Sequence, residues 1–332
     1  MSAILEVDDL TVDIPLPGGV LHAVQGVSFS LSKGETLCLV GESGCGKSLT
    51  SLAVMDLLPR NALRRAKRLV LSGEDLLTKS ERQMNDIRGD RMSMIFQEPM
   101  TSLNPAYTIG NQLEEVFRRH RRVARREATD RAVYLLERVG ITAAASRLGQ
   151  YPHQLSGGLR QRVMIAMALM CEPDLVIADE PTTALDVTIQ AQILLLLAEL
   201  QAEFQMALVL ITHDLGVVSR VADKVAVMYA GQIVEQAGKR EIFESPLHPY
   251  TQGLLGCILI PGKKPRGSQL GVIPGMVPSL VGDMLGCRFR DRCDHATAVC
   301  ADADVPLRPA SEGRRHSYRC VLDRAALTAL SG

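Results

Sequence analysis

A glycine-rich stretch near the N-terminus has the residue types and spacing needed to hold phosphate groups. Residues 41–48 read GESGCGKS and fit the pattern G-x-x-x-x-G-K-[ST]. Glycines let the backbone curl so that successive N–H groups and a helix N-terminus face an anion. Lys47 would reach the β- and γ-phosphates of a nucleotide, and the Ser48 hydroxyl would bind Mg²⁺. The predicted phosphate-binding residues are Gly41, Glu42, Ser43, Gly44, Cys45, Gly46, Lys47, Ser48 and Leu49.

Two adjacent carboxylates follow an apolar run later in the chain. The run LVIAD is typical of a buried strand, and it ends at Asp179, which is followed by Glu180. A phosphate loop of this kind needs a second metal-binding carboxylate at the end of a neighbouring strand. We therefore expect Asp179 to bind Mg²⁺, usually through water, and Glu180 to polarise the attacking water as a general base. A helix cap is the simpler alternative for this pair.

A second candidate anion site is the sequence LSGG at residues 155–158, which precedes an apolar helical segment. Ser156, Gly157 and Gly158 would supply an N-cap hydroxyl, exposed N–H groups and the positive end of a helix dipole. The same pattern is also that of an ordinary helix cap. Because the chain has two phosphate sites but one complete metal site, we expect each nucleotide to be shared between two subunits.

Four of the eight cysteines crowd into one C-terminal segment. Cys287, Cys293, Cys300 and Cys320 provide four thiolates, enough for one tetrahedral zinc ion or one cubane cluster. In a reducing compartment such a group favours metal over disulfide bonds. The close C-x2-C pairs of many zinc sites are absent, so the spacing favours a [4Fe–4S] cluster with a structural role. Zinc and unmetallated thiols are the alternatives.

Composition limits the possible partners of this 332-residue chain. Lys and Arg total 37, as do Asp and Glu, so there is no global basic field to hold nucleic acid. No apolar run approaches the roughly 18 residues of a membrane span, and the N-terminus lacks a secretory signal. We expect a cytosolic protein that reaches a membrane only through a partner.

The surrounding pattern predicts the elements that must position these residues. A strand, the glycine-rich loop and a helix follow one another at residues 36–58, which is the context that a phosphate loop requires. Residues 111–170 are expected to be mostly helical. Other predicted elements are strands at 4–14, 174–179 and 207–212, a helix at 187–203, and strand pairs within 20–31 and 225–236. Beyond about residue 240 the Pro and Gly content rises and the periodicity fades.

These motifs, in this order, resemble the ATP-binding cassette (ABC) ATPases over about residues 4–240. The resemblance implies an α/β P-loop NTPase fold with a RecA-like core, an antiparallel β subdomain and a helical subdomain, and ATP as the nucleotide. It also assigns roles to three further residues. Gln97 would sense Mg²⁺ and couple to a transporter, Asp186 would contact the partner ATPase, and His213 would lie at the γ-phosphate.

Two residues depart from the family pattern. Leu159 stands where the signature usually has Gln, although LSGG itself is intact. No aromatic residue precedes Phe29, and Ile14 occupies the place of the residue that usually stacks on adenine. We therefore expect adenine to pack against aliphatic side chains, so that selectivity for the base is weaker. Similar affinities for ADP and GTP analogues would support this expectation. A strong preference for adenine would contradict it.

The resemblance narrows further to the dipeptide and oligopeptide permease branch. The segments that carry it include FQEPMTSLNP, YPHQLSGG and SPLHPYTQGLL, at residues 96–105, 151–158 and 245–255. It implies an ATPase domain at residues 1–250, with a helical insert at about 98–170, and a peptide-permease-type, Cys-rich C-terminal extension at 251–332. The resemblance to such tails also favours the [4Fe–4S] cluster.

Membership of this branch implies several partners. They are two transmembrane permease subunits, a second homologous cassette ATPase that makes a heterodimer, and an extracytoplasmic substrate-binding protein, with no nucleic acid. The chain would then lie at the cytoplasmic face of the inner membrane as a peripheral subunit and drive import of di- or oligopeptides. The alternatives are an importer ATPase for nickel or another small solute, and a soluble cassette ATPase without a transport role.

Overall fold

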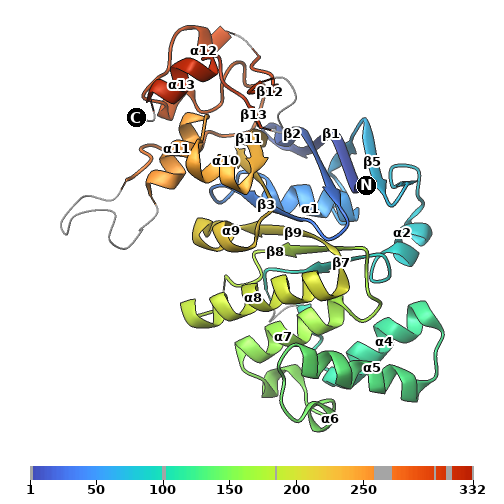
Figure 1. Cartoon of the computed structure of the whole chain (residues 1–332). Coiled ribbons are helices and arrows are strands. Elements are labelled where there is room, and N and C mark those ends of the chain that lie inside the picture. The colour runs from blue at the N-terminus through green and yellow to red at the C-terminus, as the bar shows by residue number, and fades with distance from the viewer. Residues whose placement is uncertain are drawn as a thin grey trace. The chain divides into compact units, whose positions relative to one another are not determined.

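The computed structural model describes residues 3–98, 102–183, 185–257, 271–302, 304–311 and 316–330 (Figure 1). Residues 99–101, which belong to the segment 96–105 quoted above, and residue 184 lie outside the described residues. The chain forms two compact units. The first unit comprises Met1–Glu6, Ser30–Thr36 and Val70–Ile211, and the second comprises Val7–Phe29, Leu37–Leu69 and Thr212–Gly332.

The first unit contains three neighbouring parallel strands of the eight-stranded sheet, β7 (Met92–Ile95), β8 (Leu175–Asp179) and β9 (Ala207–Thr212). Every residue of β8 and β9 is buried, as expected for parallel strands covered on both faces. The strand predictions at 174–179 and 207–212 are confirmed. A short hairpin of β5 (Arg68–Leu71) and β6 (Glu74–Asp75), which we did not predict, is also present.

Helices make up most of the rest of this unit, and the helical expectation for residues 111–170 is confirmed. The green helices α4, α5 and α7 in Figure 1 pack against one another, and α7 also contacts α8. Thr108, Ser156 and Asp186 each cap a helix through a side-chain oxygen. The helices are α2 (Glu81–Ile87), α4 (Ile109–Arg121), α5 (Arg125–Arg138), α6 (Ala144–Arg147), η1 (Pro152–Gln154), α7 (Gly157–Ala168) and α8 (Val187–Phe204).

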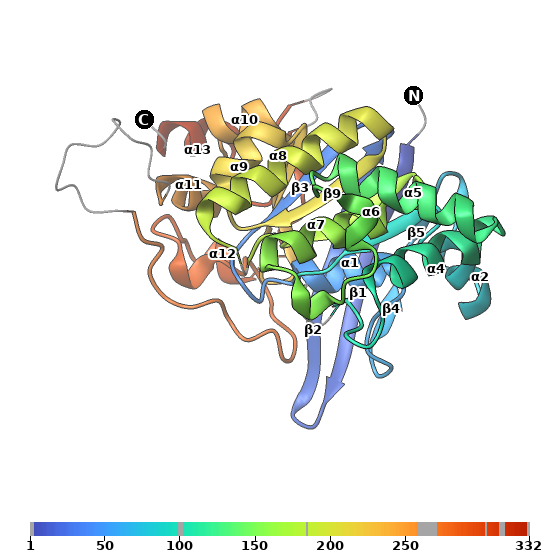
Figure 2. The same cartoon turned by 90° about the horizontal axis from the view of Figure 1, so that it is seen from below.

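The second unit holds most of two long strands, β1 (Ala3–Leu16) and β2 (Gly19–Ser32), which form a ribbon in Figure 2, with β4 (Leu63–Arg65) beside β1. The strand pair predicted within residues 20–31 is wrong, because β2 is continuous. Gly26 takes a positive φ of 63° within β2, so its backbone bends locally without reversing the chain.

The other five strands of the eight-stranded sheet belong to this unit and carry the phosphate loop. They follow the order β12 (Arg308–Pro309), β13 (Ser317–Tyr318), β11 (Gln232–Gly238), β10 (Lys224–Tyr229) and β3 (Thr36–Val40). The β3–β10 pair is parallel, and the other neighbours are antiparallel. The predicted strand pair within residues 225–236 is confirmed as β10 and β11.

The C-terminal segment adds its short strands to that sheet, where Tyr318 pairs with Glu235. Leu247, Tyr318, Cys320 and Leu327 form one buried apolar cluster, and α13 therefore lies near the start of α11 (Figure 2). Segments on both sides of residue 250 thus share one compact unit, and the domain boundary there stays a prediction. The helices of the second unit are α1 (Lys47–Met55), α9 (Leu215–Val221), α10 (Lys239–Glu244), α11 (Pro249–Gly256), η2 (Arg290–Arg292), α12 (Val299–Asp302) and α13 (Arg324–Leu330).

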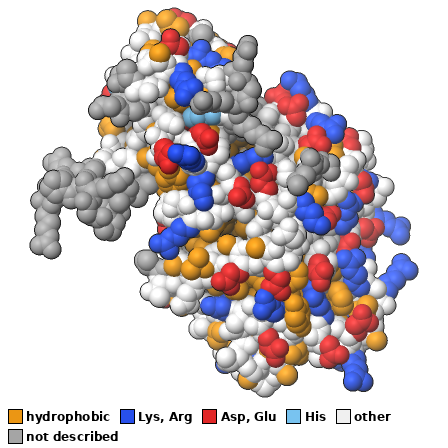
Figure 3. Space-filling view, viewed as in Figure 1, with side chains coloured by type: hydrophobic (Ala, Val, Ile, Leu, Met, Phe, Trp, Pro, Cys, Tyr) orange, Lys and Arg blue, Asp and Glu red, His pale blue; other side chains and the backbone are white. Residues whose placement is uncertain are grey.

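The described helices include none that combines the length and apolar character needed to cross a bilayer. Acidic and basic side chains are interspersed over the face shown in Figure 3. Two arginines of α4 form ion pairs that neutralise their charge locally. Arg119 pairs with Asp86, and Arg121 pairs with Asp90. These pairs agree with the balanced overall charge of the chain.

Candidate functional site

The phosphate loop joins β3 to α1 in the second unit, as predicted, and two of its glycines are required by close backbone contacts. Gly41 and Gly46 have φ values of 155° and 104°. A Cβ atom on Gly41 would lie 2.1 Å from the Met228 carbonyl oxygen, and one on Gly46 would lie 2.5 Å from that of Ala23. Neither position can accept a side chain without moving the backbone, so the glycines allow the loop to curl at both ends.

The lysine of the motif lies across this loop. Lys47 is 4% exposed, and its Nζ donates hydrogen bonds of 2.9 Å to the carbonyl oxygens of Gly41 and Glu42. Ser48 and Leu49 are half-buried on the first turn of α1, while Ser43 and Gly44 are exposed. The loop thus gathers a buried cation, a hydroxyl and a helix N-terminus, a combination suited to phosphate and a Mg²⁺ ion.

Cys45 stands inside the loop and is fully buried. Burial raises the pKa of its thiol, which the nearby Lys47 ammonium only partly offsets. The thiol is therefore protonated near neutral pH and packs as a small apolar group.

Sequence reasoning missed two residues that contact this loop from far along the chain. The Tyr250 hydroxyl accepts a hydrogen bond from the Glu42 N–H group, and the Arg292 guanidinium pairs with the Glu42 carboxylate. They lie 208 and 250 positions from Glu42, so no local spacing could identify them. Tyr250 belongs to the segment SPLHPYTQGLL, which marked the family but assigned no role to that side chain.

In the first unit, the structure brings Gln97 and Glu180 together after the ends of β7 and β8. Asp179 ends β8 and is 6% exposed. The Glu180 Oε2 atom accepts hydrogen bonds from Gln97 Nε2 at 3.3 Å and from Thr183 Oγ1 at 2.8 Å. Sequence reasoning missed Thr183, although it lies only three residues after Glu180, in the sequence ADEPTT at residues 178–183. The arrangement orients a carboxylate beside a buried acidic group, which suits Mg²⁺ binding and activation of water.

The LSGG segment forms the start of α7, as predicted. The Ser156 Oγ atom accepts a 3.4 Å hydrogen bond from the Leu159 N–H group, so it caps the helix, and Ser156 and Gly157 are exposed. A Cβ atom on Gly158 would lie 3.2 Å from Ile189 of α8. Asp186 in turn caps α8 by accepting a 3.0 Å bond from the Ile189 N–H group. The helix N-terminus of α7 is thus accessible at the surface of the first unit.

His213 and Ile14, the other two residues singled out from the family pattern, belong to the second unit. His213 follows β9 and is exposed, and the Asp214 N–H group beside it donates to Thr212 Oγ1. Ile14 is half-buried near the end of β1. The roles of both residues stay predictions.

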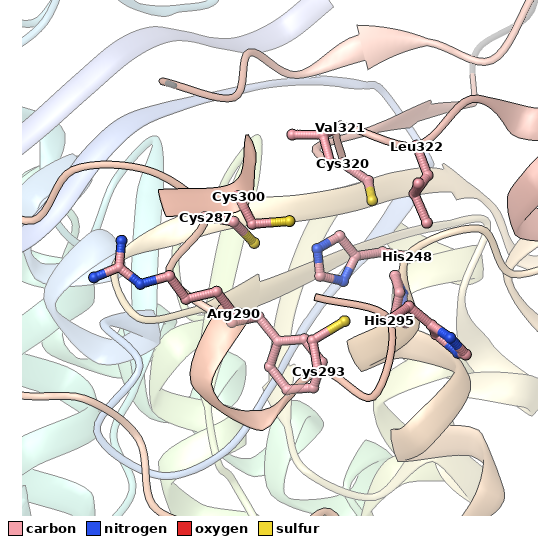
Figure 4. Close-up of a pocket in the computed structure, with 11 residues that line it drawn as sticks. His248, Cys287, Arg290, Cys293, His295, Cys300, Cys320, Val321 and Leu322 are labelled. Atoms are coloured by element: carbon pink, nitrogen blue, oxygen red, sulfur yellow. The ribbon is translucent and has the colours of Figure 1, made fainter. Parts of the chain in front are cut away.

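The four C-terminal cysteines, distant in sequence, line one pocket of the second unit. Figure 4 shows the sulfur atoms of Cys287, Cys293, Cys300 and Cys320 around a common space that His248 also lines. None of the eight cysteines, all of which are among the described residues, forms a disulfide bond. Burial, and then the neighbouring thiols, raise the pKa of Cys287 and Cys293, the latter to about 11.

Two arginines, the buried Arg288 and the half-buried Arg319, are sequence neighbours of Cys287 and Cys320. Arg288 donates to the Ala230 carbonyl and the Gln25 side chain, and Arg319 donates to the carbonyls of Ile233 and Val305. In the part of the chain that the structure describes, neither guanidinium forms an ion pair with a carboxylate, and burial lowers the pKa of both. Two largely desolvated guanidiniums therefore lie next to cysteines that line the pocket, with Asp304 as the nearby carboxylate that acts on both. Among the same described residues, no group of three or more His, Cys, Asp or Glu side chains is arranged to hold a single metal ion.

Two family patterns match the chain. The family described as "ABC transporter" matches residues 24–183, and "Oligopeptide/dipeptide transporter, C-terminal region" matches residues 234–300. The first match contains the phosphate loop, LSGG and the paired carboxylates, and the second contains Tyr250 and Arg292.

Relatives with similar sequences cover nearly the full chain. The dipeptide transport ATP-binding protein DppD of Bacillus subtilis is 50% identical over 301 residues, which are 90% of this chain and 89% of the relative. The oligopeptide transport ATP-binding protein OppD of Salmonella typhimurium is 48% identical over 313 residues, covering 94% and 92%. Among solved structures, the dimeric structure of the bacterial ABC transporter cassette MJ0796 matches with a TM-score of 0.63 at 25% identity, covering 71% of this chain and 99% of that one.

Proposed function

The chain belongs to the ATP-binding subunits of oligopeptide and dipeptide transporters within the ABC transporter family, and we propose that it drives peptide import as one of two such subunits beneath two membrane permeases. The observation that carries this proposal is the extent of the similarity. It does not stop at the ATPase motifs but continues through the C-terminal region that is described for peptide transporters. This chain is therefore an ATP-hydrolysing transporter subunit.

Its own residues divide the work of binding and hydrolysis. The backbone N–H groups of the phosphate loop and the Lys47 ammonium would hold the phosphates. Mg²⁺, a hard cation that prefers oxygen ligands, would be bound by Ser48 and Asp179 with Gln97 nearby, and it would neutralise charge that develops on the phosphates. Glu180 would accept a proton from the attacking water, and His213 would contact the γ-phosphate.

A second cassette ATPase would complete each nucleotide site. The α7 N-terminus presents Ser156 and Gly157 at the surface, where they can meet the γ-phosphate of a nucleotide held by the partner's phosphate loop. Asp186 would contact that partner. We propose a heterodimer, with closure of the two ATPases moving the permeases through a groove near Gln97. To shift the equilibrium between open and closed dimers from 1:99 to 99:1, ATP must bind the closed dimer about 5.5 kcal/mol more tightly than the open one.

The membrane position of this subunit follows from its partners. We place it at the cytoplasmic face of the inner membrane as a peripheral subunit, held there by two transmembrane permeases. An extracytoplasmic binding protein would deliver the peptide. Since this subunit does not contact the cargo, nickel or another small solute is the alternative substrate.

The four pocket cysteines would hold a [4Fe–4S] cluster that cross-links the C-terminal segment. Four thiolates are the usual ligand set of such a cluster, and all four cysteine side chains line one common pocket. The charge of the groups near the pocket is the second observation that supports a cluster. A cluster bound by four thiolates is anionic, and the guanidiniums of the buried Arg288 and the half-buried Arg319 would help to balance it, since the one carboxylate with an electrostatic effect on both, that of Asp304, forms no ion pair with either among the described residues.

Metal analysis of anaerobically purified chain tests this assignment. We expect iron and acid-labile sulfide in equal amounts, and loss of both after Cys293→Ser or Cys320→Ser. Cys257→Ser is the matched control, because Cys257 lies outside the pocket and should keep full loading. Zinc without sulfide would establish the alternative metal, and absence of all three elements would leave the cysteines as free thiols.

Affinity purification tests the transport role. The tagged chain would be recovered from detergent-solubilised membranes of its own host and its partners identified by mass spectrometry. Two polytopic permeases and a second cassette ATPase are the expected partners, and their reconstitution with the binding protein should give ATPase activity that dipeptides stimulate. Stimulation by nickel instead would change the cargo, whereas recovery of ribosomal or DNA-repair proteins without membrane partners would overturn the transport role.

A further inference from the structure

A contact between the C-terminal segment and the phosphate loop is formed by Arg292 and Glu42. Arg292 Nη1 lies 2.7 Å from Glu42 Oε2, and Arg292 Nη2 lies 3.0 Å from Glu42 Oε1. The pair is therefore bidentate, a geometry that fixes orientation as well as charge. The Arg292 side chain is 6% exposed and that of Glu42 is 28% exposed, so solvent screens the pair only weakly.

The remaining donors of Arg292 are also occupied. Its Nε donates to the Pro274 carbonyl at 2.8 Å and its Nη2 to the Ile273 carbonyl at 3.2 Å. The guanidinium carbon lies 5.7 Å from the centre of the Tyr229 ring, within cation–π range. These contacts hold the Arg292 guanidinium in one orientation. Because the guanidinium in turn binds both carboxylate oxygens of Glu42, residues outside the phosphate loop fix the position of that carboxylate.

A second contact holds the backbone of the same loop residue. The Glu42 N–H group donates to the Tyr250 hydroxyl at 3.0 Å, and Tyr250 is fully buried with its ring 4.6 Å from that of Tyr229. Burial raises the pKa of Tyr250, so the hydroxyl stays neutral. The N–H group and the carboxylate of Glu42 are thus both anchored to the C-terminal half of the second unit.

We propose that Arg292 is a positioning residue that holds the phosphate loop in its ATP-binding conformation through Glu42, which makes the C-terminal segment a working part of the nucleotide site. Glu42 follows Gly41, the first glycine of the loop, and its carbonyl accepts a hydrogen bond from Lys47. A displaced Glu42 would therefore move both the loop backbone and the lysine expected at the phosphates. The proposal rests on the ATP-binding role of this chain.

Equilibrium binding of Mg²⁺–ATP to the full-length chain tests this, in a Glu180→Gln background that prevents turnover. Arg292→Ala should raise the dissociation constant about tenfold, the loss of one charge-assisted bidentate contact. Arg292→Lys, which keeps the charge but not the two parallel bonds, should give a smaller rise in the same direction. Arg240→Ala is the control, because Arg240 is an exposed arginine of the same unit that pairs with Glu244.

A coupled substitution separates positioning from general folding. If Arg292 acts through Glu42, the effects of changing the two residues should not add. The double variant Glu42→Gln/Arg292→Lys should then bind ATP no more weakly than whichever single variant binds it more weakly. In the assembled importer, Arg292→Lys should raise the KM for ATP and leave kcat within about twofold. Unchanged ATP affinity in folded Arg292→Ala and Arg292→Lys chains, or additive effects of the two changes, would overturn the proposal. Failure of the unsubstituted chain to bind ATP would instead contradict the ATPase assignment itself.

Discussion

Glu180 is held in a backbone conformation that side chains other than glycine seldom adopt. Its φ is 43°, and its N–H group donates to the Ile211 carbonyl at 3.0 Å. Left-handed φ at such a residue costs on the order of 1 kcal/mol and persists where the surroundings fix it. Here, Gln97 and Thr183 both donate to the carboxylate, which is consistent with a side chain that must point in one direction.

Substitution of Glu180 by Gln tests this residue as the general base. The amide keeps the shape but cannot accept a proton, so we expect steady-state ATP hydrolysis in the assembled importer to fall at least about 100-fold. ATP binding should be retained. An assay of phosphate release measures the loss of hydrolysis, and an ATP titration of the same variant shows whether binding is retained. Glu244→Gln, on the exposed face of α10, is the matched control, and hydrolysis within a few-fold of normal in Glu180→Gln would exclude Glu180 from this role.

The phosphate loop offers a comparison between two glycines. Both Gly44 and Gly46 have positive φ, at 78° and 104°, so alanine is strained at either position. Only at Gly46 would the new Cβ also meet backbone, 2.5 Å from the Ala23 carbonyl oxygen; at Gly44 nothing lies within 4 Å. Gly44→Ala should therefore cost about 1 kcal/mol of folding stability, while Gly46→Ala costs more and displaces the loop.

Thermal unfolding and ATP titration of the two variants check that difference. We expect Gly46→Ala to lose ATP binding beyond tenfold and Gly44→Ala to change it only slightly. If Gly44→Ala and Gly46→Ala lowered ATP affinity equally, the close backbone contact at Gly46 would not explain the loss, and the exposed middle of the loop would matter as much as its ends.

At the scale of whole elements, helix α7 combines a structural cap with a predicted phosphate contact at one residue. Ser156 caps the helix, and its neighbour Gly157 is exposed. Asp is about as good an N-cap as Ser, whereas its negative charge would repel a phosphate. Ser156→Asp should consequently leave the melting temperature nearly unchanged and abolish ATP-driven closure with the second ATPase.

Ser156→Ala gives the complementary result. It removes the cap at a cost of about 1 kcal/mol but adds no charge, so the chain should melt slightly earlier and still close, with weaker ATP dependence. Light scattering of the two ATPases mixed with ATP measures closure, and calorimetry measures stability. Normal closure of the Ser156→Asp chain would leave Ser156 with the capping role alone.

The elements with strong local patterns were predictable, and those defined by distant contacts were not. The apolar run of β8 and the strand, glycine-rich loop and helix around Lys47 appear where the pattern indicates, because burial on both faces and turn chemistry act over a few residues. The two-residue strand β6 carries too little pattern to detect. The interruption expected within β2 was wrong, since a single glycine bends a strand as readily as it ends one.

The same limit applies to the functional residues. The carboxylate pair after an apolar run identified Glu180, the family resemblance identified Gln97, and the structure places the two side chains in contact. Arg292 could not be found in this way, because its partner Glu42 lies 250 positions away and an isolated arginine between cysteines has no recognisable spacing. This contact forms only when the folded chain brings the phosphate loop and the C-terminal segment together, so no local sequence pattern records it.

At the scale of the whole molecule, one short turn connects the cysteine pocket to the nucleotide site. The turn η2 ends at Arg292, and Cys287 and Cys293 on either side of it line the pocket. A metal cluster held by these cysteines would fix the turn and with it the guanidinium on Glu42. The state of the pocket should therefore influence ATP affinity through Arg292.

Anaerobic removal of the metal by a chelator provides the last test. ATP affinity of the otherwise unsubstituted chain should fall toward that of Arg292→Ala, by up to about tenfold, while the Arg292→Ala chain should lose little more because the connection is already broken. Iron content and ATP titration on the same samples measure cause and effect together. An equal fold-loss of affinity in both chains would show that the metal supports the fold in general rather than through Arg292, and an unchanged affinity in both would separate the pocket from nucleotide binding altogether.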